Sequence, residues 1–160
     1  CGVVPLSERF GGNQVDGAAY DAMIGAVDAM LRPFEDKHAI APQVASGTVQ
    51  MLGTSGTVTT LAGISLDLPR YDRNVVDGST LGVEDALRIA RHLAGLDYKG
   101  RAAIPCVGPE RADLVVAGCA ILEAICRRWR VARLRVADRG LREGILLGLM
   151  QGAAELAGRF

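Results

Sequence analysis

The sequence predicts an α/β domain in which amphipathic helices pack on a small sheet. Two observations support this fold class. Short apolar runs typical of strands alternate with helical segments along the chain, and this order is typical of layered α/β folds. The chain has 160 residues, of which 49% are hydrophobic. That length and apolar content suit one domain with its own core, so we treat residues 1–160 as a single domain.

Three short runs of β-branched and apolar residues predict strands, near residues 3–8, 48–53 and 131–136. The first run opens the chain. The second is interpreted as a buried strand that ends at a glycine, and the third carries interspersed arginines. Three strands are few for a sheet covered by five helices, so we expect further strands upstream of residue 1. The lack of an initiator methionine fits an origin inside a longer protein.

Five segments predict helices, at residues 16–32, 58–62, 83–94, 108–125 and 141–156. Asp16 suits the N-cap of the first helix, whose apolar residues recur at three- and four-residue steps for packing on a sheet, and Pro33 is expected to end it. The segment that begins at Gly108 has a proline and acids suited to a first turn. Because it is apolar on nearly every side, we expect it at the centre of the core. Residues 34–46 and 63–78 are expected to be loops.

The composition disfavours several classes of partner. Eighteen Lys and Arg residues balance eighteen Asp and Glu residues, and no run of like charges suggests a nucleic-acid arm or a basic membrane segment. Only 4% of the residues are aromatic, too few for a base-stacking surface. No apolar run approaches the roughly 20 residues needed to span a bilayer. We therefore expect neither nucleic acid nor a membrane as a partner.

The cysteines and histidines do not form a metal-binding pattern. No C-x-x-C pair occurs, and Cys119 and Cys126 lie inside an apolar helical pattern, where they are interpreted as small core residues. His38 and His92 are too isolated to complete a zinc site, and a disulfide framework is not expected in so apolar a chain. We expect no metal ligands within this chain and a reducing, cytoplasmic location.

A glycine-rich loop between a predicted strand and a predicted helix is the strongest local signal. It consists of Gly53, Thr54, Ser55, Gly56 and Thr57. Glycines let the backbone approach a ligand, and free N–H groups at the start of the next helix favour a negative charge, so phosphate is the natural occupant. The loop is neither a P-loop nor a Rossmann motif. An equally weighted alternative is that the glycines only shape the turn and the hydroxyls cap the helix.

Arg111 is a second candidate, in the first turn of the predicted central helix. A cation is unfavourable there unless an anion or a carboxylate meets it. The guanidinium could bind phosphate oxygens, or it could form an intrahelical pair with Glu110 or Asp113. Placement alone favours the pair. The sequence shows no Ser/His/Asp order and no paired carboxylates, so no catalytic residue is assigned within the chain.

Four segments in order resemble the exopolyphosphatase and guanosine pentaphosphate phosphohydrolase (Ppx/GppA) family, at residues 2–10, 52–62, 108–122 and 138–145. Members of this family are similar to actin and sugar kinases, with two ribonuclease H-like α/β domains that close on a phosphate-filled cleft. The resemblance implies that this chain is the second, C-terminal domain of a two-domain phosphatase. The first β-hairpin of that domain would precede residue 1.

The resemblance also implies an activity, a cofactor and site residues. The activity is removal of the terminal phosphate from inorganic polyphosphate or guanosine pentaphosphate, with Mg²⁺ held mostly by groups outside this chain. Matched position by position, the loop Gly53–Thr57 would cradle phosphate, and Arg111 would reach toward the phosphorylated substrate. Asp77 stands where the family often has histidine, which leaves its role open.

The implied partners are a phosphate-rich substrate and the N-terminal domain, which would carry the catalytic glutamate and another phosphate loop. This chain alone is therefore expected to be inactive. The alternative is a regulatory module of the actin-like superfamily that binds phosphate or nucleotide without hydrolysis. A third interpretation, a dimerisation domain, would show a large exposed apolar face. The sequence allows a homodimer but does not require one.

Overall fold

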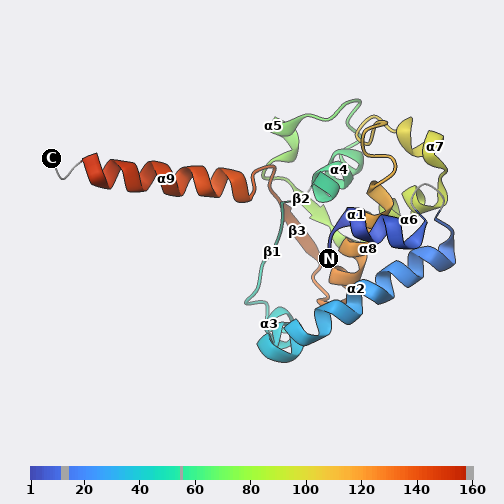
Figure 1. Cartoon of the computed structure of the whole chain (residues 1–160), viewed down its shortest axis with the longest axis horizontal. Coiled ribbons are helices and arrows are strands. Elements are labelled where there is room, and N and C mark those ends of the chain that lie inside the picture. Colours follow the sequence, from blue (N-terminus) through green and yellow to red (C-terminus); the bar gives the residue numbers. More distant parts are fainter. Residues whose placement is uncertain (12–14, 55, 158–160) are drawn as a thin grey trace.

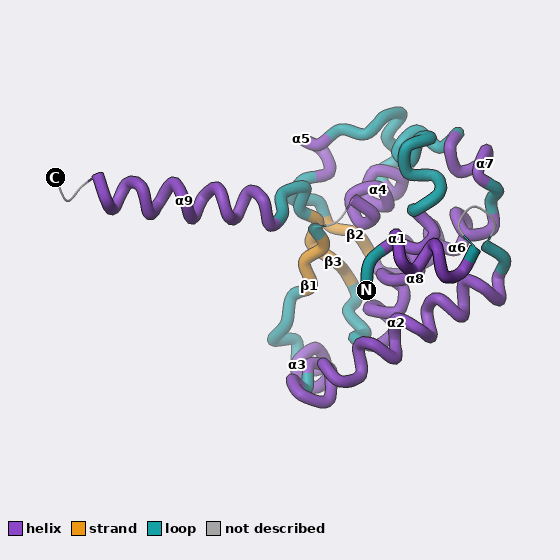
Figure 2. The backbone as a smooth tube through the Cα atoms, viewed as in Figure 1, coloured by secondary structure: helices purple, strands orange, loops and turns teal. Residues whose placement is uncertain are grey.

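The computed structural model describes residues 1–11, 15–54 and 56–157. Helices pack around a small three-stranded sheet (Figures 1 and 2). The elements in chain order are α1 (Val3–Phe10), α2 (Gly17–His38), α3 (Ile40–Ala45), β1 (Met51–Gly53), α4 (Gly56–Ser65), α5 (Arg73–Val76), β2 (Thr80–Gly82), α6 (Val83–Gly95), α7 (Tyr98–Ala102), α8 (Val115–Arg128), β3 (Arg133–Val136) and α9 (Leu141–Ala157). The predicted α/β class is confirmed.

The sheet has the strand order β1-β3-β2, with β1 parallel and β2 antiparallel to β3. Leu134 and Val136 of β3 are buried on the side covered by helices. Because β1 and β3 are parallel, their carboxyl ends lie at the same edge of the sheet. The backbone N–H of Ala137 donates to the carbonyl of Gly53 at 2.9 Å. The loops that follow β1 and β3 are therefore neighbours.

Helix α8 forms the centre of the core, as its apolar pattern predicts. It packs against α1, α2, α4 and α6. Cys119 and Cys126 are buried in it, which confirms their interpretation as small core residues. Burial raises the pKa of the Cys119 thiol to about 12 and that of the Cys126 thiol to about 11. Both side chains are therefore protonated at neutral pH and pack as small apolar groups.

The predicted opening strand is wrong, because residues 3–10 form helix α1. Val3 and Val4 are β-branched and suggest a strand, but Pro5 lies in the first turn of the helix, where its missing N–H costs little. Leu6 is buried, and the helix packs on α8. Burial of one apolar face against a distant helix outweighs the local strand preference.

Helix α2 continues through Pro33 to His38, beyond the predicted end. Its buried apolar stripe packs on α8 and not, as predicted, on the sheet. The last turns are stabilised by Trp129. Its ring lies edge-on to Phe34, with centroids 6.0 Å apart, and its indole N–H bonds to Glu35. These contacts compensate for the backbone hydrogen bond that proline cannot make.

Several short elements have no clear signal in the sequence. Residues 34–46, expected to be a loop, contain the end of α2 and all of α3, and residues 63–78 contain α5. Strand β2 and helix α7 were not predicted from the sequence either. Residues 109–114 form turns, so α8 begins only at Val115. Strand β1 is shorter than predicted and is not buried, since Leu52 is 57% exposed.

Glu35 connects α2, α3 and the end of α8. Its carboxylate accepts hydrogen bonds from Trp129 Nε1 at 2.5 Å, from the N–H of Ala41 at 3.0 Å and from that of Ile40 at 3.1 Å. These bonds, the Trp129 bond foremost, hold the pKa of Glu35 below its ordinary value of 4.5. A lowered pKa in the folded state adds stability that is complete above the unfolded-state pKa. That stability is lost as pH falls through the folded-state pKa.

We expect the fluorescence of Trp129, the only tryptophan, to change on acidification with a midpoint below pH 4.5. The measurement is a fluorescence titration of the native chain. Glu35→Gln, which removes the titrating group, is the control and should abolish the transition. A midpoint at or above pH 4.5 would contradict the assignment.

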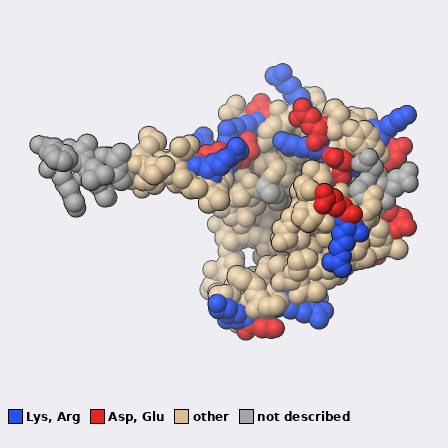
Figure 3. Space-filling view, in the orientation of Figure 1, with Lys and Arg blue, Asp and Glu red and all other residues tan. Residues whose placement is uncertain are grey.

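Helix α9 extends away from the rest of the molecule (Figure 1). Its exposed large apolar side chains are Leu141, Ile145, Leu146, Leu147, Leu149 and Met150. Across the described residues, no helix combines the length and the apolar character needed to cross a bilayer. On the face shown in Figure 3, basic and acidic side chains are interspersed, in keeping with their equal numbers.

Candidate anion-binding site

The glycine-rich loop joins β1 to α4, as the sequence predicts. Gly53 ends the strand, and Gly56 begins the helix. Thr54 and Gly56 are exposed, whereas Ser55 lies outside the described residues. The first N–H groups of a helix have no partner within the helix and carry a partial positive charge. An exposed start of α4 is therefore a suitable place for an anion.

Two glycines allow the close packing around this loop. A Cβ atom on Gly53 would lie 2.6 Å from Val58 Cγ1, and one on Gly118 of α8 would lie 2.1 Å from Thr57 Oγ1. Gly53 thus lets the chain turn tightly into α4, as the turn-shaping alternative requires. Gly118 lets α4 approach α8 with the Thr57 hydroxyl directed at α8. The structural and the ligand-binding roles of the loop are compatible.

Arg111 lies in the turns before α8 and not, as predicted, in the first turn of that helix. Its Nη1 donates to Thr60 Oγ1 at 2.9 Å, and its guanidinium carbon lies 5.9 Å from the centre of the Tyr71 ring. Among the ion pairs of the described residues, none joins Arg111 to Glu110 or Asp113. The intrahelical-pair interpretation of Arg111 is therefore wrong, although Arg111 as a residue is exposed.

Gly56 and Thr57 of the loop border one cavity of about 280 Å³ together with Arg111, whereas Gly53 and Thr54 line a second cavity that shares Thr57. The polar lining residues of the first cavity are Gly56, Thr57, Thr60, Glu110 and Arg111. The start of α4 and the guanidinium favour an anion, whereas the carboxylate of Glu110 opposes one. The remaining lining residues, Val3, Leu114 and Val115, are apolar. The described part of the chain holds no group of three His, Cys, Asp or Glu side chains that could bind a metal ion.

The turns that carry Arg111 are held by α7. Arg101, 1% exposed, donates from Nε to the carbonyl of Ala112 at 2.6 Å and from Nη1 to that of Leu96 at 2.5 Å. The Tyr98 hydroxyl donates to the carbonyl of Pro109 at 3.1 Å. Burial lowers the pKa of the Arg101 guanidinium. Two side chains of one short helix therefore position the backbone on both sides of Arg111.

Sequence reasoning missed Tyr71 as a neighbour of the site. Its ring lies beneath the Arg111 guanidinium, and its hydroxyl is buried. Burial raises the pKa of this hydroxyl. The only sequence signal was an aromatic residue beside charged ones in a segment expected to be a loop. Tyr71 supports Arg111 through an attraction between cation and ring.

Asp77 has a structural contact that clarifies its place in the fold. Its Oδ1 accepts from the backbone N–H of Asp138 at 2.9 Å, and its Oδ2 lies 3.6 Å from Arg139 Nε. Arg73 Nε in turn lies 3.1 Å from Asp138 Oδ2. Arg73, Asp77, Asp138 and Arg139 therefore form a local ion-pair network. They fix the turn after β3 beside the glycine-rich loop.

Comparison with known proteins agrees with the resemblance seen in the sequence. A model of the Ppx/GppA phosphatase family matches residues 1–153. Exopolyphosphatase 2 of Mycobacterium tuberculosis is 30% identical over 102 residues, which cover 61% of this chain and 32% of that protein. A putative exopolyphosphatase of Haemophilus influenzae is 30% identical over 104 residues, which cover 64% of this chain and 30% of that protein.

Solved structures share the fold. An Aquifex aeolicus member of the Ppx/GppA family superposes with a TM-score of 0.78 at 22% identity, over 95% of this chain and 47% of that one. An exopolyphosphatase from Cytophaga hutchinsonii gives a TM-score of 0.71 at 24% identity, over 91% of this chain and 46% of that one. This chain therefore spans just under half the length of the solved proteins that it matches.

Proposed function

Since the chain belongs to the Ppx/GppA phosphatase family, we propose that it forms one wall of an active site that removes terminal phosphate from inorganic polyphosphate or guanosine pentaphosphate. The cavity shared by the glycine-rich loop and Arg111 is the observation that carries this proposal. Phosphoryl transfer depends mainly on positioning and on neutralising negative charge. The start of α4 would hold phosphate oxygens, and Arg111 would bind further oxygens of the same substrate.

In this proposal the active site is completed by a preceding domain. The chain spans about a third of its curated relatives and just under half of the solved ones. Strand β1 lies at an edge of the sheet, with Leu52 exposed, and an apolar cavity of about 330 Å³ adjoins it. An upstream β-hairpin would pair with this edge and extend the sheet into a ribonuclease H-like one. The catalytic glutamate would come from upstream as well.

The cofactor, the compartment and the assembly are part of the same proposal. Mg²⁺ would neutralise charge on the phosphates, but the described side chains of this chain do not form a complete site for it. We therefore assign no step to the metal. The cysteines are free, three of them buried, as suits a protein of the reducing cytoplasm. The expected partner is the N-terminal domain, and a homodimer is compatible with the proposal.

The test of the proposed function is phosphate release from polyphosphate and from guanosine pentaphosphate in the presence of Mg²⁺. We expect no turnover by the 160-residue chain alone and multiple turnovers by the two-domain protein that contains it. The preferred substrate is the one with the higher kcat/KM. Multiple turnovers by the chain alone would contradict the need for an upstream glutamate. Binding without phosphate release by the two-domain protein would overturn the hydrolase assignment.

Arg111→Ala in the two-domain protein is expected to lower kcat/KM by roughly a hundredfold to a thousandfold, the usual cost of removing one donor to charge that develops in the transition state. Arg111 is exposed, so the midpoint of thermal unfolding should remain within about 2 °C of the parent value. Arg88→Ala removes an exposed arginine of α6 and is the matched control. Unchanged steady-state kinetics for Arg111→Ala would leave the guanidinium with only its contacts to Thr60 and Tyr71.

A further inference from the structure

Five arginines lie close together around the end of α8 and along β3, at positions 127, 128, 130, 133 and 135. The first two are paired with acids. Arg127 Nη2 lies 2.6 Å from Glu123 Oε1, and Arg128 Nη2 lies 2.5 Å from Asp28 Oδ1. The other three form no ion pair with any described residue. The formal net charge of the chain is zero, so the three unpaired arginines make this region locally positive.

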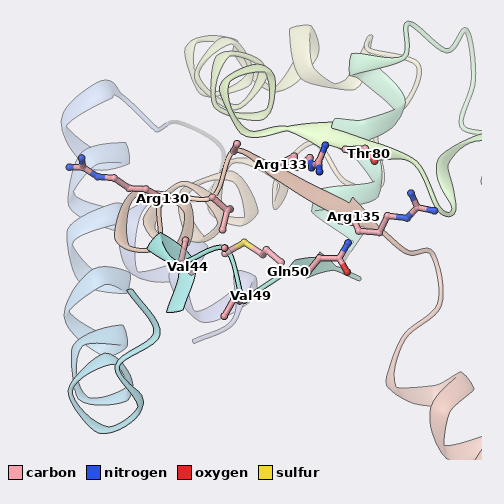
Figure 4. Close-up of a pocket in the computed structure, with 11 residues that line it drawn as sticks. Val44, Val49, Gln50, Thr80, Arg130, Arg133 and Arg135 are labelled. Carbon is pink, nitrogen blue, oxygen red and sulfur yellow. The ribbon is translucent and has the colours of Figure 1, made fainter. Parts of the chain in front are cut away.

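Arg133 and Arg135 share the face of the sheet opposite the helices. The side chains of β3 alternate, with Leu134 and Val136 buried and both arginines exposed. Residues two apart on a strand have Cα atoms about 6.6 Å apart, so the two arginine side chains leave the same face of β3 at successive positions. In Figure 4 they project from β3 near Thr80, whereas the Arg130 guanidinium points away from them.

This face is hollowed into a cavity of about 660 Å³. Its polar lining residues include Arg133, Arg135, Thr80 and Gln50, and its apolar lining residues include Val44, Val49, Met51 and Val131. Gly78 has a φ of +80°. A Cβ atom added to Gly78 would lie 3.6 Å from Arg135 Nη2. The Arg135 guanidinium therefore lies directly against the backbone of the turn before β2. None of the described residues that line the loop–Arg111 cavity lines this one.

We propose that the Arg133–Arg135 cavity binds a linear oligophosphate, at a site separate from the loop–Arg111 cavity. Arg133 and Arg135 line the same cavity, and each guanidinium can bind phosphate oxygens through parallel N–H donors, which matches a ligand with several phosphates in a row. The amide of Gln50 and the hydroxyl of Thr80 add donors to the same lining. The ligand is either free inorganic oligophosphate or the phosphate chain of a nucleotide. The site does not depend on the hydrolase proposal.

The test is titration of the 160-residue chain with inorganic tripolyphosphate, followed by the amide NMR signals of the chain. We expect saturable shifts at Thr80, Arg133 and Arg135, and an affinity that falls steeply with added salt. Arg133→Gln/Arg135→Gln should weaken binding at these signals at least tenfold. Arg111→Gln should leave them unchanged, because that arginine belongs to the other cavity.

Arg32→Gln/Arg88→Gln is the charge-matched control, since it removes two exposed arginines from α2 and α6. The proposal is overturned if this control weakens binding as much as Arg133→Gln/Arg135→Gln does, or if Thr80, Arg133 and Arg135 show no saturable shifts.

Orthophosphate should bind at least tenfold more weakly than tripolyphosphate, and equal affinities would overturn the need for several phosphates. A nucleoside triphosphate that binds more tightly than tripolyphosphate would identify the nucleotide as the source. The reverse order would identify inorganic oligophosphate.

Discussion

Arg101→Ala is expected to lower the free energy of unfolding by about 4 kcal/mol. The substitution removes a large, fully buried side chain and leaves the carbonyls of Leu96 and Ala112 without the donor that now meets them. A cavity of this kind costs about 2–5 kcal/mol, and each buried unsatisfied carbonyl costs about 1–3 kcal/mol when it finds no water. Partial relaxation and entry of water keep the total near the middle of these ranges.

Urea unfolding followed by Trp129 fluorescence measures this loss. Lys99→Ala is the matched control, since it removes an exposed cation from the same helix, and it should change stability by less than about 0.5 kcal/mol. Arg101→Lys should lie between the two, because one ammonium group cannot span both carbonyls. A loss below about 1 kcal/mol for Arg101→Ala would show that the turns around Arg111 do not need this guanidinium.

Glu123→Ala should lower the free energy of unfolding by about 3 kcal/mol. The Glu123 carboxylate, 1% exposed, accepts from the Tyr20 hydroxyl at 2.9 Å, from Arg91 Nη2 at 2.5 Å and from Arg127 Nη2 at 2.6 Å. It therefore ties α2 and α6 to α8. Removing one partner of a buried ion pair costs about 3–5 kcal/mol. The lower end applies here, because Arg91 and Arg127 are half exposed and can return to water.

The Tyr20 phenol also loses its acceptor when Glu123 is removed. Burial raises the pKa of the Tyr20 hydroxyl far above its usual range, so it stays protonated and needs an acceptor that alanine does not supply. Glu123→Gln keeps one acceptor oxygen and should cost about half as much. The control is Asp85→Ala, which breaks the exposed pair with Arg88 and should cost less than about 1 kcal/mol. Equal losses for Glu123→Ala and Asp85→Ala would contradict a structural role for the buried cluster.

The elements beside the candidate site could be predicted because their signals are local. An apolar run that ends in glycine marks β1 and its loop, and the pattern of β3 and the turn after it is similarly self-contained. Helix α1 could not be predicted in this way, because contact with α8 decides its conformation. The extension of α2 past Pro33 likewise depends on Trp129, far along the chain.

In the candidate site, too, local signals could be predicted from the sequence and contacts between distant residues could not. The glycine-rich loop and Arg111 could both be selected from the sequence, but their shared cavity depends on contacts that no local pattern reveals. Arg101 lies in a short helix without a clear sequence signal, and an arginine there is normally taken for a surface residue. Gly118, inside an apolar helix, gives no hint that it faces Thr57. The loop–Arg111 geometry is therefore a property of the packed core.

Helix α9 divides the molecule into parts with different backbone dynamics. It is a 17-residue helix that extends from the body with its described leucines exposed to water. A helix of that length without tertiary packing is only marginally stable. The amide hydrogens of α9 therefore exchange with solvent much faster than those of α8. The α8 amides exchange only when the core itself unfolds.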